Sequence, residues 1–386
     1  MIDFRSDTVT RPTPAMRQAM QGAELGDDVF GDDPTVNRLQ AFAAEALGFE
    51  AALFAPSGTQ TNLIALMCQC ERGDEAIVGQ MWHTYRWEGG GMAVLGSIQP
   101  QPIENQPDGT LRIDDIAAAI KPDDPHFART RLIGLENTTG GKVLPLRYLE
   151  EVGALARSRG LLMHLDGARL FNAAAAISGS LGDSLKASTN FDSSAGEGRP
   201  AAGKGTDTVR RPRQSEILAA ARRICAPFDT VSVCLSKGLG APVGSLVLGS
   251  TQTIARGRRI RKMLGGGMRQ AGVIAAAGLH ALEHHLERLT DDHDNARMLF
   301  EGLTRASQET RALQGKLRIA SPDTNILFVD VDPVIGDSFQ AYLKREGVAV
   351  TGGAYHGGLR QRWVTHLDVD RDAVQRSLAI VNRFTG

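Results

Sequence analysis

The sequence predicts an α/β protein: a large domain with a mostly parallel sheet, followed by a smaller C-terminal α/β domain. Short apolar runs rich in β-branched residues alternate with longer amphipathic stretches, which is typical of parallel strands joined by crossover helices. A second such pattern begins after the glycine cluster at 265–267. The length of 386 residues also exceeds that of one typical domain, so we expect two packed units.

The elements of the large domain follow from these runs in order. Strands are expected near residues 74–79, 93–98, 131–137, 160–168, 228–236 and 244–250. The clearest helix between them runs from Leu146 to Arg159, with apolar residues at Leu149, Val152, Leu155 and Ala156. Because ligands gather at the carboxyl ends of parallel strands, the residues that follow these runs are the first candidates for a site.

The C-terminal part shows its own αβ pattern. A long Ala-rich helix is expected from about Arg269 to His285, and strands are expected at 325–331 and 347–351. We therefore expect an N-terminal arm at 1–25, a large domain at 26–265, and a linking helix with the small domain at 266–386.

One segment, 178–223, departs from this pattern. It is rich in Ser, Gly, Ala, Thr and Lys/Arg and has hardly any large apolar residues. Such a composition cannot bury enough surface to offset the entropy of ordering. We expect a flexible polar loop that projects from the surface, with a helical pattern resuming near Glu216 to Ile224.

Charge and hydropathy exclude several classes of protein. The 43 Lys+Arg and 44 Asp+Glu residues leave a formal charge of -1, so no net field favours nucleic acid or an anionic membrane. Asp3, Arg5 and Asp7 interrupt any apolar run at the start, so we expect no signal or transit peptide. No stretch reaches the roughly 18 apolar residues that span a bilayer. We expect a cytoplasmic enzyme.

The cysteines and clustered histidines give no sign of a metal. The four cysteines lack zinc-site spacing, and we expect them to be small buried residues in a reducing compartment: Cys68, Cys70, Cys225 and Cys234. His280, His284 and His285 share a charged helix face, which is more often solvated than metal-binding.

Lys237 lies in the segment LSKGLGAP, directly after an apolar run. A lysine at a strand end among small residues can approach a flat aldehyde cofactor closely and form a Schiff base with it. A surface lysine in a glycine-rich turn is an equally good interpretation of this motif taken alone.

Asp166 occupies a comparable place in LDGAR, again at the end of an apolar run. A buried Asp beside a pyridine nitrogen keeps that nitrogen protonated, which makes the ring an electron sink for a carbanion. A structural Asp that caps the next helix is the alternative, and the more common one when the motif stands alone.

A third motif, PSGTQTN at 56–62, follows an apolar run and leads into a helical stretch. Small residues at a helix N-terminus present free backbone N–H groups and the positive end of the helix dipole, which suits a phosphate. Many helix N-caps look like this without a ligand. The three motifs together, in this order, are far more specific than any one of them.

These and further motifs resemble the low-specificity L-threonine aldolases. The matching segments cover nearly the whole chain except the polar insert: MIDFRSDTVTRPT, GDDVFGDDPTVN, SGTQTN, KPDDPHFARTRLIGLEN, GKVLPL, LDGARLFNA, LSKGLGAPVGS, RKMLGGGMRQAG and WVTHLDV. The resemblance implies the aspartate-aminotransferase-like fold (fold type I) of enzymes that use pyridoxal 5'-phosphate. It also implies a homotetramer, a dimer of dimers, with active sites at subunit interfaces.

The resemblance assigns the cofactor contacts residue by residue. Lys237 matches the Schiff-base lysine, Asp166 the partner of the pyridine nitrogen, and His83 the histidine that stacks on the ring. The contacts to or near the phosphate match Ser57, Gly58, Thr59, Ser236, Lys262 and Arg269, with Lys262 and Arg269 reaching across the interface.

The substrate contacts are carried over in the same way. Arg169 matches the arginine near the cofactor's phenolic oxygen and the substrate carboxylate. Ser6 and Arg362 match the remaining carboxylate contacts, with Arg360 as an alternative to Arg362. His126 matches a second histidine that faces the substrate side chain.

The activity that the resemblance implies is cleavage of L-threonine or L-allo-threonine, a small β-hydroxy-α-amino acid, to glycine and acetaldehyde through a quinonoid form of the cofactor. His83, directly or through water, is the candidate base. The alternatives are a β-eliminating lyase or an aminotransferase on the same fold, or a non-catalytic relative.

Two departures from the family pattern stand out. Thr139 ends the segment Glu136-Asn137-Thr138-Thr139, where the family usually has a histidine, and we expect little effect on the core reaction. The other departure is the polar insert, which could alter substrate access if it packs over the site.

Overall fold

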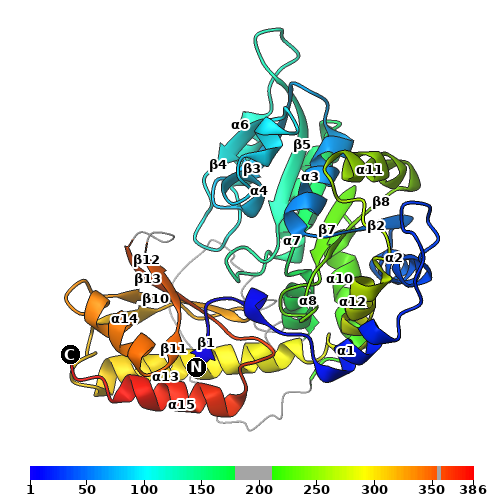
Figure 1. The fold of residues 1–386 in the computed structure, drawn as a ribbon. Coiled ribbons are helices and arrows are strands. Elements are labelled where there is room, and N and C mark those ends of the chain that lie inside the picture. The colour runs from blue at the N-terminus through cyan, green and yellow to red at the C-terminus, as the bar shows by residue number, and fades with distance from the viewer. Residues whose placement is uncertain (179–210, 354–357) are drawn as a thin grey trace.

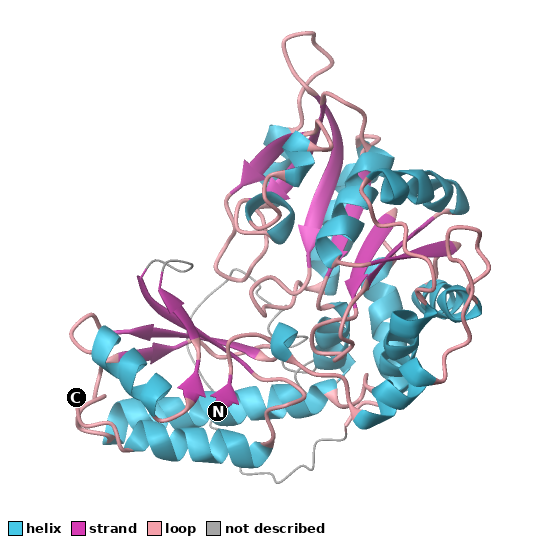
Figure 2. Cartoon of the chain, viewed as in Figure 1, coloured by secondary structure: helices cyan, strands magenta, loops and turns pink. Residues whose placement is uncertain are grey.

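The structure is a computed structural model that describes residues 1–178, 211–353 and 358–386. Figure 1 shows a large part built around one sheet and a smaller part at the lower left, where both chain termini lie. The elements of each part are coloured by type in Figure 2.

The large part contains, among the described residues, a seven-stranded sheet with the order β2-β8-β7-β6-β5-β3-β4. Neighbours from β7 to β4 are parallel, whereas β8 runs antiparallel to both β2 and β7. The strands are β2 Ala51–Ala55, β3 Asp74–Gly79, β4 Gln99–Ile103, β5 Arg129–Glu136, β6 Leu162–Gly167, β7 Thr230–Cys234 and β8 Ser245–Gly249. The predicted fold class is confirmed.

Five of the six strands expected in this part are confirmed as β3, β5, β6, β7 and β8. The strand predicted at 93–98 is wrong: helix α5 (Gly91–Val94) occupies its start, and β4 begins only at Gln99. Val94 and Leu95 are 76% and 57% exposed, so this apolar run is not buried in the sheet.

The helices of the large part supply the other half of its core. They are α1 Pro14–Gln21, α2 Pro34–Leu47, α3 Gly58–Gln69, α4 His83–Arg86, α5, α6 Ile113–Ala119, α7 Leu146–Ser158, α8 Leu170–Ser178, α10 Gln214–Cys225, α11 Thr251–Met263 and α12 Gly272–His284. Helices α7 and α12 confirm the predicted helices at 146–159 and 269–285. Ile133 and Leu165 of the sheet and Leu39 and Val152 of the helices are fully buried in one cluster. None of the described helices is long and apolar enough to cross a membrane.

The small part has an antiparallel sheet with the order β12-β13-β10-β9. Its elements are α13 Leu289–Glu309, β9 Leu317–Ile319, β10 Ile326–Val331, α14 Gly336–Arg345, β11 Val348–Ala349, β12 Thr351–Gly353, β13 Gly358–Val364 and α15 Arg371–Asn382. The strand predicted at 325–331 is β10. The strand predicted at 347–351 corresponds to two short strands, β11 and β12.

The start of the N-terminal arm joins the small part, whereas its helix α1 packs on α12 in the large part. Strand β1 (Ile2–Asp3) pairs in parallel with β11, and Phe4 packs against Trp363 with ring centroids 5.2 Å apart. The short helix η1 (Asp7–Val9) follows, with Ser6 as its N-cap. The arm therefore brings Ser6 and Asp7 from the small part toward the sheet of the large one.

The expected polar loop at 178–223 falls largely on residues 179–210, which lie outside the described residues. Its last ten residues are instead the helix α10, which packs on α8 and buries Ile217 and Ala221 completely. This matches the helical pattern expected from Glu216 to Ile224. The hydroxyl of Ser178 donates to the carbonyl of Glu216 at 3.1 Å, so the two helices that flank the segment meet.

Candidate active site

Three neighbouring strands end at the candidate site. The ladder between β5 and β6 pairs Glu136 with Asp166 at their carboxyl ends, and Lys237 comes shortly after the end of β7. The charge of Lys237 acts on the carboxyls of Asp7 and Glu136 and on the ring of His83. Because parallel strands end at the same edge of a sheet, Lys237 and Asp166 meet there as expected.

Asp166 is 2% exposed, and both of its carboxylate oxygens accept hydrogen bonds. Oδ1 accepts from the backbone N–H of Ala168 at 3.0 Å, and Oδ2 accepts from Nδ2 of Asn62 at 2.8 Å. The same Asn62 amide nitrogen donates to Oε1 of Glu88 at 2.8 Å. Asn62, on the second turn of α3, thus joins two buried carboxyls and fixes the orientation of Asp166.

Behind Asn62, the fully buried His164 completes this network. Oδ1 of Asn62 lies 3.2 Å from Nε2 of His164, and an amide oxygen can only accept, so His164 carries its proton on Nε2. Its Nδ1 then accepts from the hydroxyl of Thr230 at 2.9 Å. Burial lowers the pKa of His164 to about 4, so this ring is neutral near pH 7.

His83 begins the short helix α4 and forms a pair with Glu88. Its Nδ1 lies 2.8 Å from Oε1 of Glu88. Burial alone would lower the pKa of His83, but the hydrogen bond that His83 donates to Glu88 and the charge of Asp166 outweigh it, and the pKa is raised. Burial also raises the pKa of Glu88. The pair therefore holds a proton more firmly than either group would in water.

The ligand atoms of His83, Glu88 and Asp166 lie within 4.8 Å of one another. Hydrogen bonds join His83 to Glu88, and Asn62 to both Glu88 and Asp166, so the three ionisable groups belong to one hydrogen-bonded network.

Glu136 holds the start of α4 in place. Its Oε2 accepts from the backbone N–H of His83 at 2.6 Å. Burial and the neighbouring charge of Asp166 raise the pKa of Glu136 to about 8. The raised pKa of Glu136 reduces the negative charge that this carboxyl adds beside Asp166.

Arg169 is anchored by Asp7 from the N-terminal arm. Nε and Nη2 of Arg169 donate to the two carboxylate oxygens of Asp7 at 2.8 and 2.6 Å. Burial alone would raise the pKa of Asp7, but the charge and hydrogen bonds of Arg169 and the charge of Lys237 together outweigh it, and the pKa is lowered. Ser6 is next to this pair, and its hydroxyl accepts from the backbone N–H of Thr8 at 3.2 Å.

Arg362 on β13 is a second cation near Arg169. Burial and then the positive charge of Arg169 lower the pKa of Arg362, so the two guanidinium groups lie within electrostatic reach. The Nε of Arg362 is buried and has no hydrogen-bond partner among the described residues. A carboxylate between the two arginines would satisfy that donor and offset their repulsion.

Arg360 is directed elsewhere. Its Nε lies 3.2 Å from Oδ1 of Asp330, and its guanidinium group lies over the ring of Phe328, 4.7 Å from the centroid. Between the two alternatives, the structure favours Arg362 as the carboxylate contact.

The N-terminus of α3 provides the expected anion cradle. Ser57 is the N-cap and accepts from the N–H of Gln60 at 3.3 Å, while the first helical residues, Gly58 and Thr59, have no acceptor within the helix. A Cβ on Gly58 would lie 3.5 Å from Oγ of Ser245. That hydroxyl is buried without a partner among the described residues. Ser236 lies on the Lys237 segment, with its hydroxyl 3.4 Å from Sγ of Cys234.

Three residues assigned by resemblance form no hydrogen bond or ion pair with the described residues of this cluster. The side chain of His126 is 86% exposed and pairs with Asp124, and it precedes β5, whose other end carries Glu136. At about 3.3 Å per strand residue, these ends are roughly 23 Å apart. The loop before β5 projects at the upper edge of Figure 1. Lys262 is exposed at the end of α11, and Arg269 forms an exposed ion pair with Asp27.

Four residues that contact the site escaped the sequence analysis: Asp7, Asn62, Glu88 and Glu136. Asp7 directly follows the candidate Ser6, and Asn62 ends the motif PSGTQTN, so proximity to those motifs was a usable signal. Glu136 also ends a predicted strand. Nothing in the local sequence marks Glu88.

Comparison with known proteins identifies the family. The model of the beta-eliminating lyase family matches residues 3–332. The low specificity L-threonine aldolase of Escherichia coli (strain K12) is 48% identical over 372 residues, which are 96% of each chain. The chain belongs to the low-specificity L-threonine aldolases.

Two further comparisons agree with this family. A probable low-specificity L-threonine aldolase 2 of Arabidopsis thaliana is 43% identical to this chain. The match covers 87% of this chain and 84% of the Arabidopsis protein. The solved structure of Leishmania major threonine aldolase superposes with a TM-score of 0.74 at 20% identity, covering 99% of each chain. That last likeness shows the fold of the family.

Enzymes of this family depend on pyridoxal 5'-phosphate, and the residues of the site fit it. A lysine, a buried and firmly oriented aspartate, and a helix N-terminus beside an unpartnered buried hydroxyl lie at one end of the sheet. These groups suit an aldehyde, a pyridinium nitrogen and a phosphate respectively.

Proposed function

We propose that this protein is an aldolase that cleaves L-threonine or L-allo-threonine to glycine and acetaldehyde with pyridoxal 5'-phosphate. The observation that supports it best is the joint presence of Lys237 and Asp166 at one sheet edge with Arg169 and Arg362 from two parts of the molecule. The first pair suits the cofactor, and the second suits the carboxylate of an amino acid. The family supports the same reaction.

The carboxylate of the substrate would be held by the two arginines. Arg169 cannot turn freely because Asp7 holds it in a bidentate contact. The Nε of Arg362 has no partner among the described residues and can donate to a carboxylate. Ser6 lies beside them as a further donor. A carboxylate fixed in this way sets which bond at the α-carbon stands perpendicular to the cofactor ring.

Lys237 would hold the aldehyde carbon, Asp166 the ring nitrogen, and Ser57, Gly58, Thr59 and Ser236 the phosphate. The bound cofactor supplies an electron sink for the pair left when the Cα–Cβ bond breaks. Asp166 contributes by staying oriented toward that nitrogen through Asn62 and Ala168.

We assign the removal of the β-hydroxyl proton to His83. With Glu88 accepting from Nδ1–H, the free Nε2 is the basic nitrogen. The raised pKa of His83 favours uptake of the proton there, because Glu88 and Asp166 stabilise the imidazolium that forms. Thr139 donates its hydroxyl to the carbonyl of Glu136 at 2.8 Å, so this departure from the family pattern is accommodated locally.

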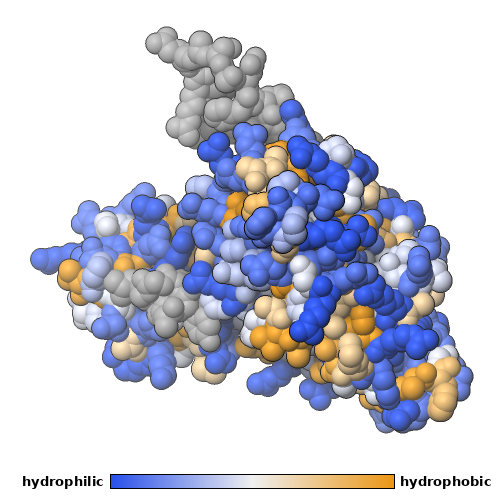
Figure 3. Space-filling model, turned by 90° about the horizontal axis from the view of Figure 1, so that it is seen from above, coloured by the Kyte–Doolittle hydropathy of each residue, from blue (hydrophilic) through white to orange (hydrophobic). Residues whose placement is uncertain are grey.

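The chain acts as a homotetramer in this proposal. His126 lies beyond the far end of β5 from the site, and the side chains of Lys262 and Arg269 are exposed; in this proposal all three would serve a neighbouring chain. Exposed apolar side chains support an interface, with Phe30, Val94 and Met263 at 77%, 76% and 68% exposure, and Figure 3 shows apolar patches on one face. Sedimentation equilibrium tests the mass of the assembly. A cytoplasmic location stays a prediction from the sequence.

The decisive experiment is to incubate the holoprotein with L-threonine, L-allo-threonine and L-serine and to measure glycine and acetaldehyde. We expect both products from one or both threonines. A 2-oxo acid released together with ammonia would instead favour the β-eliminating lyase, and a 2-oxo acid formed without ammonia would favour the aminotransferase. No turnover and no visible cofactor absorbance would favour a non-catalytic relative.

A second test of the assignment is the variant Lys237→Ala. It should lose both turnover and cofactor absorbance while it keeps its fold. Lys237 is only partly buried and lies in a loop, so its removal creates no core cavity. Substantial aldol cleavage by this variant would contradict the assignment.

A further inference from the structure

The junction between α12 and α13, residues 285–288, lies against the segment that follows Lys237. Nδ1 of His285 is 2.9 Å from the carbonyl oxygen of Leu239, and Nη1 of Arg288 donates to the carbonyl of Gly238 at 2.8 Å. A carbonyl can only accept, so His285 donates through Nδ1–H. Two consecutive carbonyls after Lys237 are therefore each held by a side chain of this junction.

The same segment is packed too closely to shift by itself. A Cβ on Gly238 would lie 3.0 Å from Cδ2 of Leu289 and 3.2 Å from Oδ1 of Asn172. Gly240 has a φ of +80°, a conformation that favours glycine, and a Cβ there would lie 2.9 Å from Cδ2 of Leu367. A shift of this loop toward α13 would therefore press on Leu289 in the first turn of that helix.

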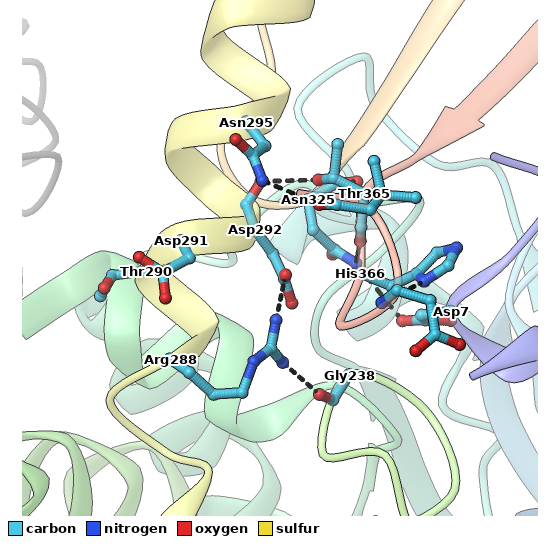
Figure 4. Close-up of polar contacts among 12 residues, drawn as sticks. Asp7, Gly238, Arg288, Thr290, Asp291, Asp292, Asn295, Asn325, Thr365 and His366 are labelled. Atoms are coloured by element: carbon cyan, nitrogen blue, oxygen red, sulfur yellow. Dashed lines mark hydrogen bonds and ion pairs between the residues drawn. The ribbon is translucent and has the colours of Figure 1, made fainter. Parts of the chain in front are cut away.

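Arg288 is held from the other side by Asp292, one turn further along α13 (Figure 4). Asp292 is 1% exposed, and its Oδ2 has no partner among the described residues. Replacing a buried ion pair of this kind by apolar residues is often neutral or stabilising. The Arg288–Asp292 pair is therefore better explained by a role in positioning the Lys237 loop than by a contribution to stability.

The first turn of α13 also connects to the carboxylate-binding side of the site. The backbone oxygen of Asp292 accepts from the hydroxyl of Thr365 at 2.6 Å, and Thr365 directly follows β13, the strand of Arg362. Nδ2 of Asn325 donates to the carbonyl of Thr365 at 3.0 Å and lies 3.4 Å from Oδ2 of Asp7. Figure 4 shows these residues converging from α13, the segment after β13 and the N-terminal arm.

We propose that Arg288, held by Asp292, is a positioning residue for Lys237. It fixes the Lys237 loop to the first turn of α13. In this way it keeps Lys237 at a constant position relative to Arg169 and Arg362, which bind the substrate carboxylate. The inference rests on the proposed function, in which Lys237 holds the cofactor. A small displacement of a reacting group is enough to cost much of the rate.

The test is Arg288→Met, which keeps an unbranched side chain and removes both charged contacts. We expect the holoprotein to lose cofactor on dilution about tenfold faster, because a charge-assisted hydrogen bond contributes roughly that factor. The kcat for L-threonine should fall more than KM rises. Borohydride reduction followed by peptide mass spectrometry measures the fraction of Lys237 linked to the cofactor. Arg288→Lys should restore part of the retention, since an ammonium group can still donate to Gly238.

The matched control is Arg147→Met, which breaks another ion pair of i,i+4 spacing, that with Glu151 on α7, and should leave cofactor retention unchanged. If Arg288→Met fails to fold, the double variant Arg288→Met with Asp292→Leu removes both buried charges and is judged by the same measurements. Wild-type cofactor retention and kcat in the folded variant would overturn the proposal. A wild-type holoprotein that retains cofactor but cleaves no threonine would overturn the proposed function alone, because cofactor retention is read without any substrate.

Discussion

At the residue scale, the charged groups of the site are held by partners from distant segments of the chain. Arg169 is held by Asp7 from the N-terminal arm, and Asp166 is held by Asn62 from α3. Hydrogen bonds to ions are stronger in such a low-dielectric setting than in water, and leaving one partner unpaired there is costly. Removal of a partner should therefore change the behaviour of the group that it holds.

Asp7→Asn tests this for the substrate carboxylate. Asp7 is fully buried, and an amide can accept only one of the two hydrogen bonds that Arg169 now donates. We expect KM for L-threonine to rise about tenfold through loss of one charge-assisted contact, with a smaller change in kcat. Steady-state kinetics at saturating cofactor measure both.

The control is Asp3→Asn, which weakens another bidentate contact of the same arm. Asp3 pairs with the exposed Arg5, so this change should leave KM as it is. An unaltered or lower KM in Asp7→Asn would show that Arg169 keeps its place without Asp7.

At the element scale, the strands that could be predicted are those buried within the sheet. β7 is buried throughout, β6 is buried except at Leu162, and β5 is buried from Leu132 to Leu135, so each strand contains buried apolar residues that mark it in the sequence. β4 reads Gln-Pro-Gln-Pro-Ile and lies at the sheet edge, where proline is tolerated. The polar sequence of β4 does not predict a strand, and the apolar run at 93–98 just before it predicts a strand in the wrong place.

Asp33 is the basis of a prediction at the element scale. Its single carboxylate caps α2 and also joins α2 to α12. Oδ1 accepts from the N–H groups of Thr35 and Val36 at 3.1 and 3.0 Å, and Oδ2 accepts from those of Gly26 and Gly272 at 3.3 and 2.9 Å. Asp33→Ala leaves buried donors unpaired in both helices. We expect the free energy of unfolding to fall by about 3 kcal/mol, measured by urea denaturation of holoprotein at fixed concentration.

Thr13→Ala is the matched control, since Thr13 is also an N-cap directly before a proline and accepts from one N–H, that of Met16. It should cost about 1 kcal/mol. Equal losses in the two variants would mean that the contacts of Asp33 with Gly26 and Gly272 contribute nothing.

At the scale of the whole molecule, the sequence predicts the centre of the site but not its supports. Lys237 and Asp166 are found because strand ends are visible as the ends of apolar runs. Their supports come from far along the chain: Asn62 lies 104 positions from Asp166, and Asp7 lies 162 positions from Arg169. No local period encodes such pairings, which arise only when the two parts pack. His126 shows the converse, because the resemblance assigns it to the substrate while the structure places it beyond the opposite end of β5.

The polar insert provides the last prediction at this scale. Asp166 and Lys237 flank it in sequence, yet the helices on either side of it, α8 and α10, pack together. The hydroxyl of Ser178 reaches the carbonyl of Glu216 at 3.1 Å, so a short connection can join the two helices. Arg211 forms an ion pair with Asp291 at 2.5 Å, and Pro212 is buried, so both should be kept.

We therefore predict that replacing residues 182–210 by a brief Gly/Ser link leaves cofactor retention and L-threonine cleavage largely unchanged. The cost of closing a loop grows only with the logarithm of its length, so a shorter link neither strains nor greatly stabilises the fold. Thermal unfolding, cofactor absorbance and glycine release measure the three properties separately. A variant that folds and holds cofactor but loses cleavage would mean that the insert shapes substrate access. One that does not fold would mean that this polar sequence carries a structural element, against the argument from its lack of large apolar residues.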